Sequence, residues 1–236
     1  MNDIFNYEHP FVCTDAVVFT VNAETPDSYR KLPEMQLKVL LYKREAEPHF
    51  DKWCLPGGFL NIDEMPEDNI RRKLSEKSDI GKCYLEQLYT FSDINRDPRA
   101  RVVSISYLGL MNESESMKFT SGAKWFIVAL QNNQISLTCG SETIDKKDLG
   151  FDHFEIIETA LERIRSKIQY SDIVFNLLPN EFTLTELQNV YEVIQNKKDS
   201  PANFRRKIIN MVSETESYSG EKGHRPAKLY TRKNTL

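Results

Sequence analysis

Charged residues whose spacing suits chemistry lie between positions 58 and 80. A helix is expected over 66–77, because Pro66 suits a first helical position, and steps of three and one residue put Lys73, Glu76 and Lys77 on one face of it. Glu76 therefore shares its face with two ammonium groups, which do not ligate a metal cation while protonated. We therefore expect Glu76 to pair with its lysine neighbours, at a gain of only ~0.2–0.5 kcal/mol per pair.

The same residues stand in a longer pattern that resembles the Nudix box, G-x5-E-x7-R-E-U-x-E-E-x-G-U, in which U is aliphatic. Residues 58–80 of this chain are G-x5-E-x7-R-K-L-x-E-K-x-D-I, with Leu-Pro-Gly before them. The residues that match the pattern are Gly58, Glu64, Arg72, Leu74, Glu76 and Ile80. The resemblance implies that the N-terminal part of an α+β protein has the Nudix fold, an α/β/α sandwich with a mixed sheet.

The departures from the Nudix box concern its chemistry. In Nudix hydrolases the box glutamates bind magnesium, which neutralises the diphosphate of the substrate and helps to activate water. Lys73 and Lys77 replace two of those glutamates, and Asp79 replaces the last glycine. We therefore expect no catalytic residue, no bound metal and no cofactor, and a pocket in which Lys73 or Lys77 neutralises a bound diphosphate. The alternative is a metal site rebuilt from other carboxylates, such as Glu64 or Asp79.

A second basic cluster surrounds Pro98. Arg96, Arg99 and Arg101 would offer bidentate donors to a phosphate, and Arg44, just after a predicted strand, is a further candidate. On charge alone, an ion-paired surface turn is the favoured alternative for this cluster. The residues predicted to bind an effector are Arg44, Gly57, Gly58, Lys73, Glu76, Lys77, Arg96, Arg99 and Arg101.

The composition fits a globular protein of one large or two modest domains. Of the 236 residues, 40% are hydrophobic and 28% charged, and no apolar run approaches the roughly 20 residues of a membrane-spanning helix. The N-terminus lacks a secretory signal, and the four cysteines form no C-x-x-C pair, which favours reduced thiols in a cytosol. Residues 181–236 hold ten basic and seven acidic side chains, whereas the rest hold 21 and 28. This asymmetry suggests two parts with different partners, and a solvated charged surface is an equal alternative.

Apolar periodicity divides the chain into an N-terminal mixed domain over 1–168 and a C-terminal domain over 169–236. A turn is expected at 53–60, around Pro56-Gly57-Gly58, and a loop at 22–33. An amphipathic helix is expected at 151–168, with an apolar stripe that begins at Phe154. Strands are expected at 13–21, 37–42, 101–111, 124–130 and 134–139, the last two paired as a hairpin.

The C-terminal part has the layout of a winged helix. Three helices are expected. The first spans 171–178, the second begins after Thr183, which forms a capping box with Glu186, and the third begins at Pro201. A polar loop at 213–223 and a short strand at 227–230 follow. The second helix of such a pair enters the major groove, where Arg and Lys contact guanine and phosphates. A three-helix protein-interaction module is the competing interpretation. The predicted DNA-binding residues are Thr183, Thr185, Asn203, Arg205, Arg206, Lys207, Lys222, His224 and Arg225.

The two parts together resemble the NrtR family of Nudix-related transcriptional regulators. The resemblance is carried by FSDINRDPRARVVSISY, GFDHFEII, EFTLTELQ, VYEVI, NFRRKI and GHRPAKLY. It implies a bacterial, cytoplasmic and nucleoid-associated homodimer that binds a palindromic operator in double-stranded DNA, represses genes of NAD metabolism and releases DNA on binding ADP-ribose, with no membrane partner. Related members control pentose utilisation, and some keep hydrolase activity. The alternatives are therefore a pentose-responsive regulator and an active pyrophosphatase on ADP-ribose or nucleotide sugars.

Overall fold

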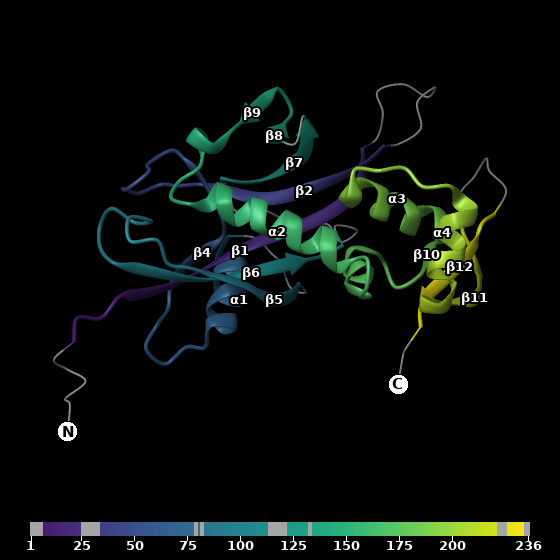
Figure 1. Ribbon diagram of the computed structural model, residues 1–236, viewed down its shortest axis with the longest axis horizontal. Helices are drawn as coiled ribbons and strands as arrows, with labels where there is room; N and C mark the ends of the chain where they lie inside the picture. Colours follow the sequence, from purple (N-terminus) through teal and green to yellow (C-terminus); the bar gives the residue numbers. More distant parts are fainter. Residues whose placement is uncertain are drawn as a thin grey trace.

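The computed structural model describes residues 7–24, 34–77, 80, 83–112, 122–131, 134–220 and 226–233. Figure 1 shows a central twisted sheet with helix α1 (Pro66–Lys77) on one face and helix α2 (His153–Lys167) across the other. The remaining helices and a small second sheet gather at one end, beyond the C-terminal end of α2 (Figure 1). The predicted α+β architecture is confirmed: a mixed sheet between helices is followed by a helical part with a small sheet of its own.

The large sheet is mixed, and its main path runs β5-β6-β1-β2-β7-β8-β9. Strand β1 is parallel to β6 and antiparallel to β2, while the short strands β3 and β4 pair with β2 and β1. The strands are β1 (Phe11–Glu24), β2 (Glu34–Lys43), β3 (Trp53–Cys54), β4 (Gly57–Phe59), β5 (Tyr84–Phe91), β6 (Val102–Leu110), β7 (Ala123–Gln131), β8 (Gln134–Cys139) and β9 (Glu142–Ile144).

Strand β1 is apolar on both faces because both faces of the sheet are covered. Val17 and Phe19 belong to the core beneath α2, whereas Ala16 and Val18 belong to the core beneath α1. This division follows from the two-residue period of a strand. A continuous apolar run is the expected signature of a strand that is buried on both sides.

The helices of the first part begin and end close to their predicted limits. Helix α1 spans the predicted residues, and α2 buries its apolar side, although Phe154 is only partly buried. Among the described residues of the whole chain, short 3-10 segments also occur: η2 (Lys146–Asp148), η3 (Ile173–Leu177) and η4 (Ile209–Met211). The segment η3 replaces the helix predicted at 171–178.

The C-terminal part folds as two helices against a small sheet of order β10-β12-β11. The predicted caps are confirmed: Thr183 Oγ1 accepts a hydrogen bond from the N–H of Glu186 at 3.1 Å, and Ser200 caps the following helix. The elements are β10 (Phe182–Thr183), α3 (Leu184–Gln195), α4 (Pro201–Ile208), β11 (Val212–Tyr218) and β12 (Lys228–Arg232).

Three predicted loops proved wrong, in part or in whole. Strand β1 extends to Glu24, into the loop expected at 22–33, and residues 25–33 lie outside the described ranges. Gly57 and Gly58, expected in a turn, form strand β4 opposite Asp15 and Thr14 of β1. A Cβ atom at Gly57 would collide with the Thr14 carbonyl, so the close strand approach requires glycine there. The expected loop at 213–223 begins with strand β11, whose polar sequence is compatible with a hairpin that exposes much of its surface. Strand β5 was not predicted, because residues such as Glu86 interrupt its apolar pattern.

The apolar core continues across the predicted boundary at residue 168. Ile164 and Ile168 belong to the same buried cluster as Ile194 of α3. Arg165 Nε donates to the Ile194 carbonyl at 2.8 Å, and Gln195 Nε2 donates to the Arg165 carbonyl at 2.6 Å. The domain limits therefore stay a prediction, and α2 packs firmly against the C-terminal part. Within the described ranges, no helix has the length and apolar character needed to cross a bilayer.

Candidate functional site

Lys73 occupies the central position of the altered Nudix box. Its stem passes so close to strand β4 that a Cβ atom at Gly58 would lie 2.7 Å from Lys73 Cε. The ammonium Nζ donates to Glu76 Oε2 at 2.8 Å, one turn further along α1. Gly58 thus leaves room for the lysine, and the lysine places its charge against the remaining box carboxylate.

Arg72 engages both retained glutamates of the box. Its Nε and Nη2 donate to the two carboxylate oxygens of Glu64 at 2.7 and 2.8 Å, and its Nη1 donates to Glu76 Oε1 at 2.9 Å. The bidentate Arg72 contact holds the pKa of Glu64 at about 2. The hydrogen bond from Lys73, followed by that from Arg72, lowers the pKa of Glu76. Both carboxylates are therefore ionised and already neutralised by cations of the chain itself.

These contacts do not suit the magnesium ion that the fold family implies. The oxygens of Glu64 and Glu76 face guanidinium and ammonium groups, which repel a divalent cation. No three His, Cys, Asp or Glu side chains gather as possible metal ligands among the residues that the structure describes. The side chain of Lys77 and the whole of Asp79 lie outside the described residues.

The three arginines around Pro98 have separate environments. Arg99 pairs with Asp97 through Nε and Nη2, at 3.0 and 2.7 Å, and its side chain is 42% exposed. Arg101 Nη1 donates to the carbonyls of Ser92 and Asp93. Arg96 is buried. The favoured alternative of an ion-paired turn thus describes Arg99, whereas Arg101 stabilises the loop backbone.

Arg96 lies at the centre of a buried charged cluster. It donates to both oxygens of Asp152, at 2.9 and 2.7 Å, and to Asp15 Oδ2 at 3.2 Å. His153 joins the cluster, with Nε2 at 3.4 Å from Asp15 Oδ1 and Nδ1 accepting a hydrogen bond from the N–H of Leu55. The cluster ties the first turn of α2 to strand β1. Sequence reasoning placed Arg96 in the effector site, but its burial withdraws the guanidinium from solvent.

Arg44 and Arg99 converge on one aromatic ring that sequence reasoning missed. The ring of Phe151 lies 5.0 Å from Arg44 Cζ and 5.8 Å from Arg99 Cζ, and Arg99 Cζ also lies 5.3 Å from the ring of Phe59. Phe59 follows Gly58, so this basic and aromatic cluster adjoins the Nudix box strand. No local signal at Phe151 predicts this meeting, because its partners are distant in the sequence.

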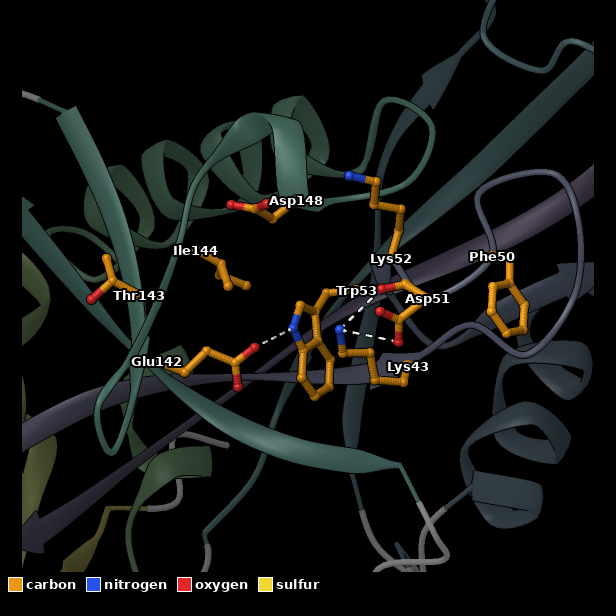
Figure 2. Close-up of a pocket in the computed structure, with 9 residues that line it drawn as sticks. All are labelled: Lys43, Phe50, Asp51, Lys52, Trp53, Glu142, Thr143, Ile144 and Asp148. Carbon is orange, nitrogen blue, oxygen red and sulfur yellow. Dashed lines mark hydrogen bonds and ion pairs between the residues drawn. The ribbon is translucent and has the colours of Figure 1, made fainter.

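A separate cavity of about 460 Å³ lies between the β2–β3 connection and strand β9 (Figure 2). Trp53 stands at its centre and donates Nε1–H to Glu142 Oε1 at 2.9 Å, while Lys43 pairs with Asp51 at 3.4 Å. None of the described residues that line it was predicted to bind an effector. Its charged groups largely neutralise one another, which gives no preference for an anion.

Helix α4 presents the predicted DNA-contacting side chains. Arg205, Arg206 and Lys207 are exposed, whereas Phe204 and Ile208 face the core. Arg206 Nη2 donates to Asn203 Oδ1 at 2.8 Å, and Lys207 Nζ lies 5.0 Å from the ring centroid of Tyr191 in α3. The exposed side of α4 is therefore basic.

Two of the remaining predicted DNA-binding residues lie at the start of α3, and the other three fall outside the described residues. Thr183 caps α3 with its hydroxyl, and Thr185 is exposed in the first turn of the same helix. Lys222, His224 and Arg225 lie outside the described residues, between strands β11 and β12. Buried Glu192 of α3 accepts a hydrogen bond at 3.1 Å from the N–H of Asp199, which lies in the turn before α4, and this contact links the turn to α3.

Two known protein families match separate segments of the chain. Residues 32–131 match the family described as "NUDIX domain", and residues 174–231 match "NrtR DNA-binding winged helix domain". The winged-helix interpretation is therefore confirmed over the three-helix interaction module.

Relatives and solved structures match nearly the whole chain. The chain is 33% identical over 231 residues to a protein of Acinetobacter baylyi described as "ADPR responsive transcriptional repressor NtrR", covering 95% of this chain and 83% of that one. A MutT/nudix family protein from Enterococcus faecalis matches with a TM-score of 0.79 at 29% identity, over 96% and 88% of the two chains. NrtR of Shewanella oneidensis complexed with a 27mer DNA matches with a TM-score of 0.69 at 34% identity, over 94% and 93%. This chain belongs to the NrtR family of Nudix-related transcriptional regulators.

Proposed function

We propose that this chain is an operator-binding repressor whose Nudix-like domain binds ADP-ribose and does not hydrolyse it. The observation that supports the absence of hydrolysis is the position of the Lys73 ammonium group, which lies 2.8 Å from Glu76. Lys73 occupies a position at which the family pattern has a metal-binding carboxylate. Effector response and repression are supported by the A. baylyi relative, described as an ADPR responsive repressor. DNA binding is supported by the S. oneidensis protein, which was solved with a 27mer DNA.

The charge arrangement suits a diphosphate ligand. The side chain of Lys73 lies close to Gly58. The next residue, Phe59, contacts Arg99 through its ring, and the Arg99 side chain is 42% exposed. A diphosphate carries two neighbouring negative groups, and guanidinium and ammonium donors form strong charge-assisted hydrogen bonds with such oxygens. We assign to Lys73, with Arg99 and Arg44, the neutralising role that a metal has in Nudix hydrolases.

The DNA-binding part suits a two-fold symmetric regulator. A homodimer would place two α4 helices in successive major grooves of a palindromic operator, about 34–36 Å apart. We propose that the regulated genes belong to NAD metabolism, and that the protein acts in the bacterial cytoplasm, where it associates with the nucleoid.

Operator release tests the proposed function. The operator is first selected by the protein from a library of random duplexes, and fluorescence anisotropy then measures its affinity with and without ADP-ribose. We expect ADP-ribose to weaken operator binding by about 5- to 150-fold, the range of usual coupling energies, in EDTA and in magnesium alike. Chromatography should detect no AMP. Accumulation of AMP with magnesium would identify an active pyrophosphatase, and release by pentoses instead of ADP-ribose would identify a regulator of sugar utilisation.

Reversing the charge of Lys73 should weaken effector binding. In EDTA, Lys73→Glu is expected to lose about 10-fold or more in ADP-ribose affinity by calorimetry, because hydrogen bonds to charged groups are worth ~1.5–3 kcal/mol. Lys147→Glu is the control, since it makes the same change of charge at an exposed side chain that pairs with Asp145. Equal affinities of Lys73→Glu and the control would remove Lys73 from the site.

A further inference from the structure

Phe151 directly precedes the start of α2, and Arg44 and Arg99 both lie against its ring. Its ring contacts the guanidinium groups of Arg44 and Arg99, and its backbone φ of 55° lies in the left-handed region. Non-glycine residues rarely adopt this conformation, and an aromatic residue held there costs conformational energy. The surrounding structure therefore forces Phe151 into a position that its own backbone preference disfavours.

We propose that Phe151 is a positioning residue of the effector site, which sets Arg44 and Arg99 for a nucleoside diphosphate and links their occupancy to helix α2. This inference deepens the proposed function and rests on it. The ring makes no reacting contact. It acts through the two arginines on one side and through the backbone of α2 on the other.

The arginines are preset for a phosphate ligand. A guanidinium that rests on a ring uses its flat face, so its N–H groups make their hydrogen bonds in its own plane. Arg44 is fixed further by the carbonyls of Pro48 and Glu47, at 2.5 and 3.5 Å, and Arg99 by Asp97. Two cations gathered on one ring are stabilised when an anion with two charged groups binds between them. Because little ordering remains to be done, such a site binds at a small entropic cost.

The two residues after Phe151 are held in place by hydrogen bonds to distant parts of the chain. Asp152 is held by the bidentate contact from Arg96, and His153 by the N–H of Leu55. Both belong to a buried cluster, and packed interiors transmit displacement rather than absorb it. A change at the ring is therefore passed to the first turn of α2.

Helix α2 carries that displacement to the DNA-binding part. Its 15 residues span about 22 Å. At its far end, Arg165 Nε donates to the Ile194 carbonyl, and the Arg165 carbonyl accepts from Gln195 Nε2 of α3. Helix α3 packs against α4, where the ring of Tyr191 meets that of Phe204 at 5.3 Å. Phe151 thus stands at one end of a continuous chain of contacts, and the recognition helix stands at the other.

Substitutions of Phe151 test this inference on the full-length protein. The variants are Phe151→Leu, Phe151→Gly and Phe151→Tyr, with Phe50→Leu as control, because Phe50 is 61% exposed in a neighbouring loop. Phe151→Gly relieves the backbone strain while it removes the ring. We expect the leucine and glycine variants to bind ADP-ribose at least 10-fold more weakly in EDTA and to need at least 10-fold more ADP-ribose than wild type to release the operator. Phe151→Tyr should keep the ADP-ribose affinity and the operator release of wild type.

The outcomes separate this inference from the function on which it rests. If wild type neither binds ADP-ribose nor releases DNA, the proposed function fails and this inference fails with it. If wild type responds and the leucine and glycine variants bind ADP-ribose within two-fold of Phe50→Leu, only this inference is wrong. Phe151→Gly could also lose operator affinity without ADP-ribose, by the same factor as it loses ADP-ribose affinity. That result would show that Phe151 maintains the fold, and it would overturn this inference.

Discussion

Replacing Arg96 with methionine is expected to lower the free energy of unfolding by about 3–5 kcal/mol, the usual consequence of removing one partner from a buried ion pair. The side chain is 3% exposed and stands between Asp15 and Asp152. Methionine fills part of the volume, but it leaves Asp152 without its bidentate partner and Asp15 with only His153 as a cation beside it among the described residues. For a chain of this size the melting temperature should fall by roughly 6–20 °C.

Urea denaturation in parallel with Arg101→Met checks this result. Arg101 is exposed, and in its described contacts it donates only through Nη1, to two loop carbonyls. Its replacement should therefore lower the free energy of unfolding by about 1 kcal/mol or less. The sequence-based assignment of Arg96 to the effector site makes a different prediction. If Arg96→Met keeps the stability of the control and loses ADP-ribose affinity instead, Arg96 is an effector contact.

Replacing Arg205 and Arg206 together with alanine should reduce operator affinity by about two orders of magnitude or more. Each good bidentate base contact is worth ~1–3 kcal/mol, and both side chains are exposed on α4. Folding should be unaffected, because the buried anchors of the helix are Phe204 and Ile208.

Anisotropy titrations over a range of salt concentrations show what these arginines contact. Loss of phosphate contacts should reduce the salt slope by about 0.9 per contact, whereas loss of base contacts should relax sequence preference at a nearly constant slope. The paired control is Lys146→Ala with Lys147→Ala, two exposed lysines of η2. Operator affinity of the α4 variant within two-fold of this control would remove α4 from the DNA interface.

The sequence by itself determined the elements whose signals are local. Pro66 marks the start of α1, the Thr183 and Glu186 pair marks the start of α3, and Ser200 with Pro201 marks the start of α4. These signals work because capping groups satisfy backbone N–H donors within three residues of themselves. The box pattern likewise placed Lys73 and Glu76 on one helical face, and their contact at 2.8 Å confirms it.

Only the tertiary structure decided what each arginine does. Arg96, Arg99 and Arg101 lie within six positions and are chemically identical, yet one is buried between carboxylates, one is ion-paired and exposed, and one holds loop carbonyls. The partners of Arg96 stand 81 and 56 positions away. Phe151, Arg44 and Arg99 likewise come from segments that are remote in the sequence. Charge type is a local property of the sequence, whereas burial and pairing depend on which distant strands and loops the fold brings together.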